Sequence, residues 1–294
     1  MSSVLDVFSD LSEQLNYNLT GFPLYVRKGT LLQFARYAAA CHWHPDLEFI
    51  LVLEGSMEYF VNRQIVRIGM SEGIFVNSKR LHYGFSTDKT NCSFIVVAVH
   101  PSLLGEDTHT GKIYLEEKFG SNTDDFVLLQ PQIPWQREIL LLLNQMYNEM
   151  YSSTCNPLRL LSQAVSLCAS IGEYILPVSG QITDNQSLMT VWKMTGFIHK
   201  QYGLKITLDN IAAAGNVCRS KCCELFRRYV GQTPNTYLLL YRIQKSCEML
   251  CETNMPISEI ALTCGFQSPG YFSYVFHKAR GSIPRDYRKL IVGS

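Results

Sequence analysis

The segment ISEIALTCGFQSPGYFSYVFHKARGSIPRDYRK, residues 257–289, contains two helical patterns with a short turn between them. Apolar residues recur at helical spacing before Gly265 and again after Pro269. Ser268 is a favourable N-cap, and proline is favoured at the first position of a helix. Two short helices joined in this way predict a helix-turn-helix, whose second helix can enter the major groove of DNA.

A weaker copy of this unit lies about fifty residues upstream. The matched pairs are Phe226 with Phe276, Gly231 with Gly281, Pro234 with Pro284 and Tyr237 with Tyr287. Between the copies, Thr233 and Pro234 predict the start of a helix that continues to about Leu250. That helix is roughly 24 Å long, enough to present two recognition helices to successive turns of DNA. The C-terminal third is therefore predicted to be an all-α tandem helix-turn-helix.

The distribution of charge supports this prediction. The chain has 294 residues and a net charge of only +1. Residues 190–294 carry 14 lysines and arginines against 6 acidic residues, whereas residues 1–189 carry 12 against 19. A basic module behind an acidic one is expected when a nucleic-acid-binding domain is joined to a domain that does not bind DNA. A solvated basic face is the alternative.

Residues 190–290 closely resemble the DNA-binding domain of the AraC/XylS transcription regulators. The family pattern is seen in the ISEIA helix, the GF turn, the YFSxxF helix and the final Gly281, Pro284, Tyr287 and Arg288. The upstream sequence LFRRYVGQTPNTYLLLYRIQKSCEML resembles the family's first unit and linker helix. The resemblance implies a one-component regulator that binds double-stranded DNA, and we expect an activator that contacts RNA polymerase.

The resemblance also implies which residues contact DNA. Base contacts are expected from Arg219, Ser220, Cys223 and Glu224 in the first unit and from Pro269, Gly270, Ser273 and Tyr274 in the second. Phosphate contacts are expected from Lys221, Arg227, Arg228, His277 and Lys278, with Gln267 and Ser268 beside them in the second turn.

Four residues in these units qualify that expectation. Cys218 stands where the family usually has a capping serine, and Glu224 stands where a basic or amide residue is common. Glu224 can accept a hydrogen bond from cytosine, but a solvated or intra-helical role is equally open. The pair Pro269 and Gly270 offers no side-chain donor, so the second unit is expected to depend more on backbone and shape contacts.

Residues 24–99 have a different texture, with short apolar runs separated by turn signals. This spacing predicts an antiparallel β-sandwich or barrel. Asn62 and Arg63 lie between two apolar runs and predict a tight hairpin turn, because asparagine tolerates a positive φ.

Within this β region, CHWHPDLEFILVLEG (residues 41–55) places His42 and His44 on one face of a strand. Glu48 keeps the same parity if the strand continues past Pro45. The series resembles the first motif of cupin barrels, and His82 stands where cupins place the histidine of their second motif. That second motif is incomplete, since Ser71 and Ile74 replace its usual proline and aspartate.

Three interpretations of this series stay open. His42, His44, Glu48 and His82 can bind a divalent metal, because imidazoles with one carboxylate suit Zn, Fe, Ni or Mn. The same four residues, with Trp43 and Tyr59, can line a pocket for a small-molecule effector, as the family resemblance implies. The histidines can also be purely structural. Further candidates for the pocket, which are core residues by default, are Glu54, Phe75, Asn77 and Tyr83.

Two amphipathic helices are expected at residues 135–151 and 157–174, followed by a linker at 177–187. Their apolar faces can pack on the β domain or on a second subunit; we favour a homodimer contact for the first and packing in cis for the second. The predicted fold class is α+β in two domains. Residues 1–130 form a cupin-like, effector-sensing antiparallel barrel, residues 131–187 a helical dimerisation and linker region, and residues 188–294 the double helix-turn-helix.

Composition excludes other classes of protein. The chain is 47% hydrophobic and 17% charged, and its apolar runs are too short to span a bilayer. The N-terminal stretch has no basic region of the secretory type, and the ten cysteines are expected to be reduced, so we predict a cytoplasmic protein without a membrane partner. We predict a regulator and not an enzyme. The rival hypotheses are a cupin metalloenzyme with an appended helical domain and a protein-binding adaptor.

Overall fold

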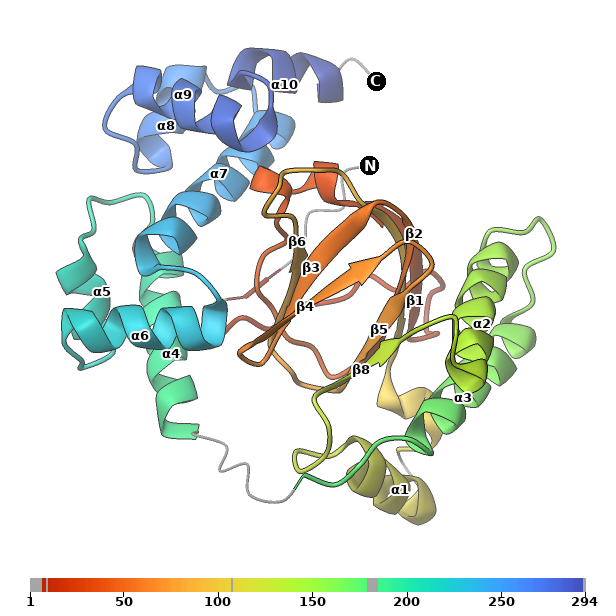
Figure 1. The fold of residues 1–294 in the computed structure, drawn as a ribbon. Coiled ribbons are helices and arrows are strands. Elements are labelled where there is room, and N and C mark those ends of the chain that lie inside the picture. The colour runs from red at the N-terminus through yellow and green to blue at the C-terminus, as the bar shows by residue number, and fades with distance from the viewer. Residues whose placement is uncertain (1–6, 9, 107, 179–184, 293–294) are drawn as a thin grey trace. The chain divides into compact units, whose positions relative to one another are not determined.

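The computed structural model describes residues 7–8, 10–106, 108–178 and 185–292. These residues form two compact units. The first contains residues 12–33 and 39–178, with all the strands and helices α1 to α3. The second contains residues 34–38 and helices α4 to α10 (Figure 1). Residues 179–184, the middle of the predicted linker, lie outside the described ranges.

The first unit is built on two antiparallel sheets. The larger has the strand order β1-β7-β2-β5-β8, and the smaller has the order β4-β3-β6. The strands are β1 (Leu24–Thr30), β2 (Leu47–Glu54), β3 (Ser56–Val61), β4 (Gln64–Gly69), β5 (Gly73–Val76), β6 (His82–Phe85), β7 (Ser93–Val99) and β8 (Phe126–Leu129). The prediction of an antiparallel, cupin-like β domain is confirmed.

The predicted hairpin turn joins β3 to β4. Val61 pairs with Gln64, which leaves Asn62 and Arg63 as the two loop residues. Their φ angles are 40° and 84°, so both lie in the left-handed region that two-residue hairpins require. The turn fixes the register of the smaller sheet.

Three helices complete the first unit: α1 (His109–Phe119), α2 (Pro134–Met150) and α3 (Pro157–Gly172). The apolar stripe of α2 is buried against β1, β2, β7 and β8, and Ile139, Leu143 and Met146 join the same core as Phe49. Trp135 of α2 stacks on Tyr174 with the ring centroids 3.7 Å apart. The stripe for which we favoured a second subunit is thus occupied within the unit, so only the outward face of α2 is left for such a contact.

The second unit consists of helices α4 (Asn185–Gln201), α5 (Leu208–Ala214), α6 (Arg219–Val230), α7 (Pro234–Glu252), α8 (Ile257–Thr263), α9 (Pro269–Arg280) and α10 (Pro284–Val292). Helices α5 and α6 form one helix-turn-helix and α8 and α9 the other, with α7 between them (Figure 1). The predicted tandem arrangement is confirmed.

The ends of the recognition helices follow the predicted capping pattern. The hydroxyl of Ser268 accepts a hydrogen bond from the backbone N–H of Tyr271, whereas Cys218 caps α6 without a side-chain bond. Both recognition helices stop at a glycine in the left-handed region, Gly231 (φ 73°) and Gly281 (φ 74°). Thr233 caps α7, which continues to Glu252. Each unit therefore starts and stops at local signals that can be found in the sequence.

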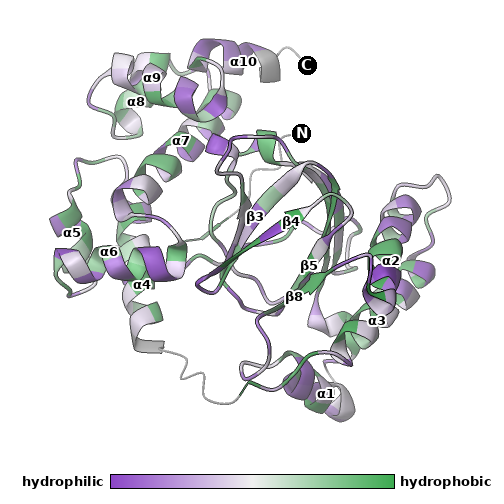
Figure 2. Cartoon of the chain, in the orientation of Figure 1, coloured by the Kyte–Doolittle hydropathy of each residue, from purple (hydrophilic) through white to green (hydrophobic). Residues whose placement is uncertain are grey.

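Side-chain character separates the elements. Strands β5 and β8 are mostly hydrophobic, whereas α6 alternates between hydrophilic and hydrophobic residues (Figure 2). In α9, Phe272, Val275 and Phe276 are buried with Ile243 and Leu250 of α7. None of the helices in the described ranges has both the length and the apolarity that crossing a bilayer requires.

Candidate functional site

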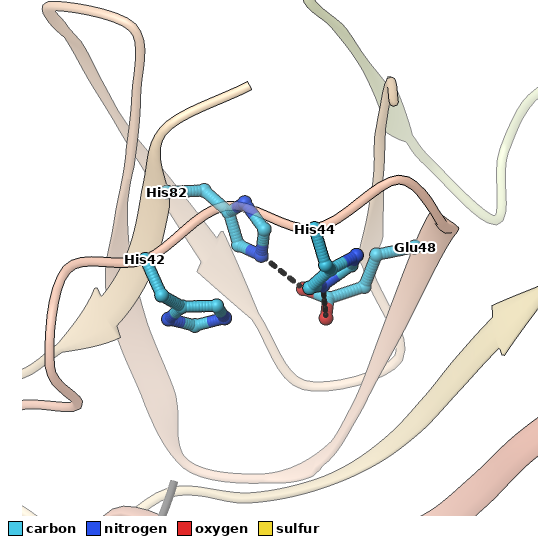
Figure 3. Close-up of side chains that lie close together, drawn as sticks. All are labelled: His42, His44, Glu48 and His82. Atoms are coloured by element: carbon cyan, nitrogen blue, oxygen red, sulfur yellow. Dashed lines mark hydrogen bonds and ion pairs between the residues drawn. The ribbon is translucent and has the colours of Figure 1, made fainter. Parts of the chain in front are cut away.

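Four buried polar side chains meet between the two sheets of the first unit: His42, His44, Glu48 and His82 (Figure 3). The backbones of His42 and His82 pair with each other, and Glu48 lies on β2. Nε2 of His44 and Nε2 of His82 are each 3.3 Å from a different oxygen of Glu48. One ligand atom from each of the four residues lies within 4.8 Å of the others. The series predicted from sequence thus forms one compact cluster.

Backbone carbonyls orient two of these rings. Nδ1 of His42 lies 2.7 Å from the Ala40 carbonyl oxygen, and Nδ1 of His82 lies 2.8 Å from the Arg80 carbonyl oxygen. A carbonyl only accepts, so Nδ1 is the donor in both rings. In a neutral imidazole the remaining Nε2 is then a lone-pair donor that faces the cluster, which is the usual outer-shell arrangement of a metal-binding histidine.

Two ring nitrogens in the cluster make no hydrogen bond within the described part of the chain. They are Nε2 of His82 and Nδ1 of His44. Buried polar atoms of this kind are uncommon in native proteins and require an explanation such as a bound ion or water. Three imidazoles and one carboxylate are also a donor set that suits divalent first-row metals. The residues present therefore fit a metal ion.

Electrostatics show what holds the cluster together without an ion. Burial, together with the neighbouring rings, holds the pKa of His42 well below its usual range. Burial opposes the charges on His82 and Glu48, but their mutual attraction prevails, so the pKa of His82 is raised and the pKa of Glu48 is lowered. The Tyr59 hydroxyl donates to Glu48 over 2.5 Å, and burial raises the pKa of Tyr59 far above its usual value. Glu48 and His82 thus form a buried ion pair within the cluster.

Glu13 and Asp46 are close to the cluster, although neither was predicted as a site residue. An oxygen of Glu13 lies 3.1 Å from Nε2 of His42, and both side chains are buried. Asp46 lies 3.7 Å from Nδ1 of His44 and accepts a hydrogen bond from Tyr17. Glu13 belongs to a segment without periodicity. It reaches the cluster because its backbone N–H donates to the Trp43 carbonyl, a contact that the sequence does not predict.

The other candidates for the pocket lie apart from the cluster. Phe75 packs on Phe49 in the core that faces α2, with the ring centroids 4.9 Å apart. Tyr83 packs on Phe60, and Glu54 is exposed at the end of β2. Asn77 donates to Thr123 and Asp124. Strand alternation explains Tyr83, because it directs that side chain away from the face that holds His82.

A second candidate site lies on the recognition helices of the second unit. Every residue predicted to contact DNA is exposed or half-buried. Exposed residues are Arg219, Ser220, Glu224, Arg227, Arg228, Gln267, Ser268, Pro269, Gly270, Tyr274, His277 and Lys278, and half-buried ones are Lys221, Cys223 and Ser273. Each helix thus buries its apolar residues and exposes its polar and basic ones.

Two ion pairs involve residues of α6. Lys221 and Glu224 are 2.8 Å apart at an i, i+3 spacing, which gives Glu224 an intra-helical partner. Arg219 forms a two-point ion pair with Asp209 of α5, in which Nε and Nη2 each donate to one carboxylate oxygen. The hydrogen bonds from Arg219 lower the pKa of Asp209. Asp209 is not among the predicted site residues, because only the turn between the helices brings it to Arg219.

Comparisons with known proteins identify a domain type for each of the two compact units. Residues 29–164 match the model of the AraC-like ligand binding domain, and residues 211–290 match that of a helix-turn-helix domain. The chain is 28% identical over 287 residues to an HTH-type transcriptional regulator of Bacillus subtilis, YdeC, covering 96% of this chain and 97% of that protein. It is 26% identical over 259 residues to the melibiose operon regulatory protein of Escherichia coli K12, covering 85% and 83%. The crystal structure of ToxT from Vibrio cholerae O395 aligns with a TM-score of 0.46 and 15% identity, covering 92% of this chain and 99% of that one.

A β domain of the ligand-binding type joined to tandem helix-turn-helix units defines a DNA-binding transcription regulator with a ligand-binding domain. More particularly, the chain belongs to the AraC family of transcription regulators. This family is one of regulators and not of enzymes, so the metalloenzyme hypothesis is excluded.

Proposed function

We propose that this regulator binds promoter DNA by inserting α6 and α9 into successive major grooves, and that residues 188–294 form its DNA-binding domain. The observation that carries the proposal is the matched pair of twelve-residue helices, each with a buried apolar face and an exposed polar or basic face. The first residues of recognition helices read base edges in helix-turn-helix proteins.

In this proposal the exposed residues divide into two groups. Base edges are read by Arg219, Ser220, Cys223 and Glu224 of α6 and by Pro269, Gly270, Ser273 and Tyr274 of α9, supported by their place at the starts of the helices. Phosphates are bound by Lys221, Arg227, Arg228, His277 and Lys278, while Gln267 and Ser268 approach the backbone at the second turn.

Salt dependence of binding tests this function. We would measure binding of the purified full chain to duplex DNA from the region upstream of its own gene, between 50 and 200 mM salt. Arg227→Ala should make the slope of log K against log salt shallower by about 1, because one phosphate contact is lost. Lys28→Ala, an exposed cation on β1, is the matched control and should leave the slope unchanged. Salt-independent binding, or no binding, would contradict the proposal.

We also propose that residues 1–130 bind a small-molecule effector and that the buried cluster holds a divalent metal, Zn, Ni, Fe or Mn. His42, His44, Glu48 and His82 would be its ligands, supported by the two ring nitrogens without hydrogen bonds and by the carbonyls that orient the rings of His42 and His82. The ion would supply positive charge next to the Glu48 carboxylate. Trp43 and Tyr59 would line the adjoining effector site.

Metal analysis and native mass spectrometry of the chain purified from its own host test the cluster. We expect about one metal per chain, lost in His82→Ala and retained in His109→Ala, a matched histidine exposed at the start of α1. If the wild-type chain carries no metal and added Zn, Ni, Fe or Mn leaves its thermal stability unchanged, the metal proposal fails. The DNA-binding proposal would be unaffected.

We further propose that residues 131–187 pair two chains into a homodimer, which acts in the cytoplasm and activates transcription by contacting RNA polymerase. Support for the dimer comes from apolar side chains exposed on α2 and α3, namely Leu141 (56% exposed), Leu158 (76%) and Val165 (43%). Light scattering should report a dimer for the wild-type chain and a monomer for Leu158→Asp. A wild-type monomer at micromolar concentration would contradict the pairing.

A further inference from the structure

The ion pair between Asp209 and Arg219 bridges the turn of the first helix-turn-helix. Arg219 is the first residue of α6, and Asp209 lies in the first turn of α5. The side chains are 65% and 56% exposed, so the pair lies on the surface and not in the core. An exposed ion pair contributes little to stability. Its position at the start of the recognition helix points to a role in binding.

The chemistry of the guanidinium group determines what this pair leaves free. The group is planar and carries five N–H donors in a fixed fork. Asp209 occupies the edge formed by Nε and Nη2. The edge formed by Nη1 and Nη2 still presents two parallel N–H groups. In the major groove, guanine is the base that offers two adjacent acceptors, N7 and O6, and this pair matches such an edge.

We propose that Arg219 reads a guanine through its Nη1–Nη2 edge and that Asp209 is the positioning residue that holds this edge toward the groove. The inference rests on the proposed binding of DNA by α6. Because the side chain is fixed before DNA arrives, it loses less conformational freedom on binding than a free arginine would.

The second helix-turn-helix lacks both partners. At the matching positions, offset by 49 and 50 residues, Ser258 replaces Asp209 and Pro269 replaces Arg219. Neither a serine hydroxyl nor a proline ring provides a fork of two donors. The preference for guanine is therefore expected only in the half of the DNA site that α6 contacts. This asymmetry would fix the orientation in which the chain binds the duplex.

A carboxylate at this place has opposite effects on affinity and on selectivity. Its negative charge repels the phosphates, so its removal strengthens binding to every sequence slightly. Its removal also frees the arginine side chain, so the preference for guanine falls. A purely structural role for Asp209 would not change base preference at a single position.

Selection from a random-sequence duplex library, followed by sequencing, tests the proposal. The proteins are the full chains of wild type, Arg219→Ala, Asp209→Asn and Glu259→Gln. Glu259→Gln removes an acid from the first turn of α8, so it controls for charge alone. At one position, guanine preference should fall on the order of 10- to 100-fold in Arg219→Ala and about 3- to 10-fold in Asp209→Asn. Glu259→Gln should keep the wild-type preference.

A second experiment changes a single acceptor of the base. It uses the best selected duplex with 7-deazaguanine at that position, in which a C–H group replaces N7. Wild-type binding should weaken about 10-fold, and Arg219→Ala should be insensitive to the change. The inference is overturned if Asp209→Asn keeps the full guanine preference, or if the preference lost in Arg219→Ala falls at another position. If the wild-type chain selects no sequence and binds no duplex, the proposed DNA binding itself fails.

Discussion

The two helix-turn-helix units share one framework and differ where they face outward. Helices α6 and α9 have twelve residues each, end at a left-handed glycine, and are followed by a helix that starts with proline. Phe226 and Phe276 occupy matching buried positions. On its outward face, the first helix-turn-helix carries Arg219 with Asp209, whereas the second helix-turn-helix carries Pro269 and Gly270 at the start of α9.

This difference separates two kinds of constraint on one fold. Inward residues must fill a core of fixed shape, so the duplicated units keep aromatic and aliphatic side chains at the same places. Outward residues are free of that demand and can diverge. Substitutions at matched residues of the two helix-turn-helix units test this difference.

Truncating the matched phenylalanines should have the largest effect. Phe226→Ala and Phe276→Ala each remove a fully buried ring, and each should lower the free energy of unfolding by about 3–5 kcal/mol. Denaturation of the full chain in urea, followed by circular dichroism, measures this loss. Tyr274→Ala, in which the ring is 60% exposed, should cost less than about 0.5 kcal/mol. If either phenylalanine variant matched that control, the two cores would not be equivalent.

Acid should destabilise the helices around the first helix-turn-helix through His199 of α4. This ring stacks on Tyr241 with the centroids 3.9 Å apart, and its Nε2 lies 2.7 Å from the Tyr237 hydroxyl. Burial, with a contribution from Lys245, lowers the pKa of His199 to about 4. The residue fifty positions after His199, which corresponds to it in the second repeat, is Met249, and its side chain does not titrate.

The sign of this effect follows from the two pKa values of His199. The unfolded chain binds a proton below about pH 6.5, whereas the folded chain does not until about pH 4. Protonation of His199 therefore costs no stability above pH 6.5, and the free energy of unfolding falls as the pH is lowered from 6.5 to 4. We expect a loss on the order of 1–2 kcal/mol, since part of the ring is solvated. His199→Gln should flatten the plot of the free energy of unfolding against pH between pH 7 and 4, as measured by urea denaturation at each pH. An unchanged slope would contradict this.

Exchanging the N-caps should have the smallest effect. Cys218→Ser gives α6 the hydroxyl that α9 already has, and it should stabilise the chain by about 0.5–1 kcal/mol. Ser268→Ala should cost about 1 kcal/mol, because the backbone N–H of Tyr271 loses its acceptor. Thermal melts of both variants measure the difference. Equal melting temperatures would mean that the caps do not distinguish the units.

Sequence predicted those features that depend on local signals. The caps at Ser268 and Thr233 and the hairpin at Asn62 follow from residue types at fixed positions. Helix α1 and strand β8 were not predicted. The residues HTGKIYLEEKF of α1 have no apolar stripe, and β8 is only four residues long.

The sites were predicted less completely, for a physical reason. His42, His44, Glu48 and His82 were found because strand parity and a known spacing bring them together. Glu13 and Asp209 were missed, since they reach His42 and Arg219 only through folding of segments that carry no spacing rule. A carboxylate that positions another side chain leaves no motif of its own.

Helix α7 lies between the first helix-turn-helix (α5 and α6) and the second (α8 and α9), and its 19 residues form one continuous helix. Each residue of an α-helix adds about 1.5 Å and turns the chain by about 100°. Inserting one residue in α7 would therefore rotate the second helix-turn-helix by about 100° about the axis of α7. Inserting seven residues, about two turns, would nearly restore the original orientation of the second helix-turn-helix while moving it about 10 Å along the axis of α7. If α6 and α9 both contact DNA, as proposed, the length of α7 sets the distance and the rotation between the two segments of DNA that they contact.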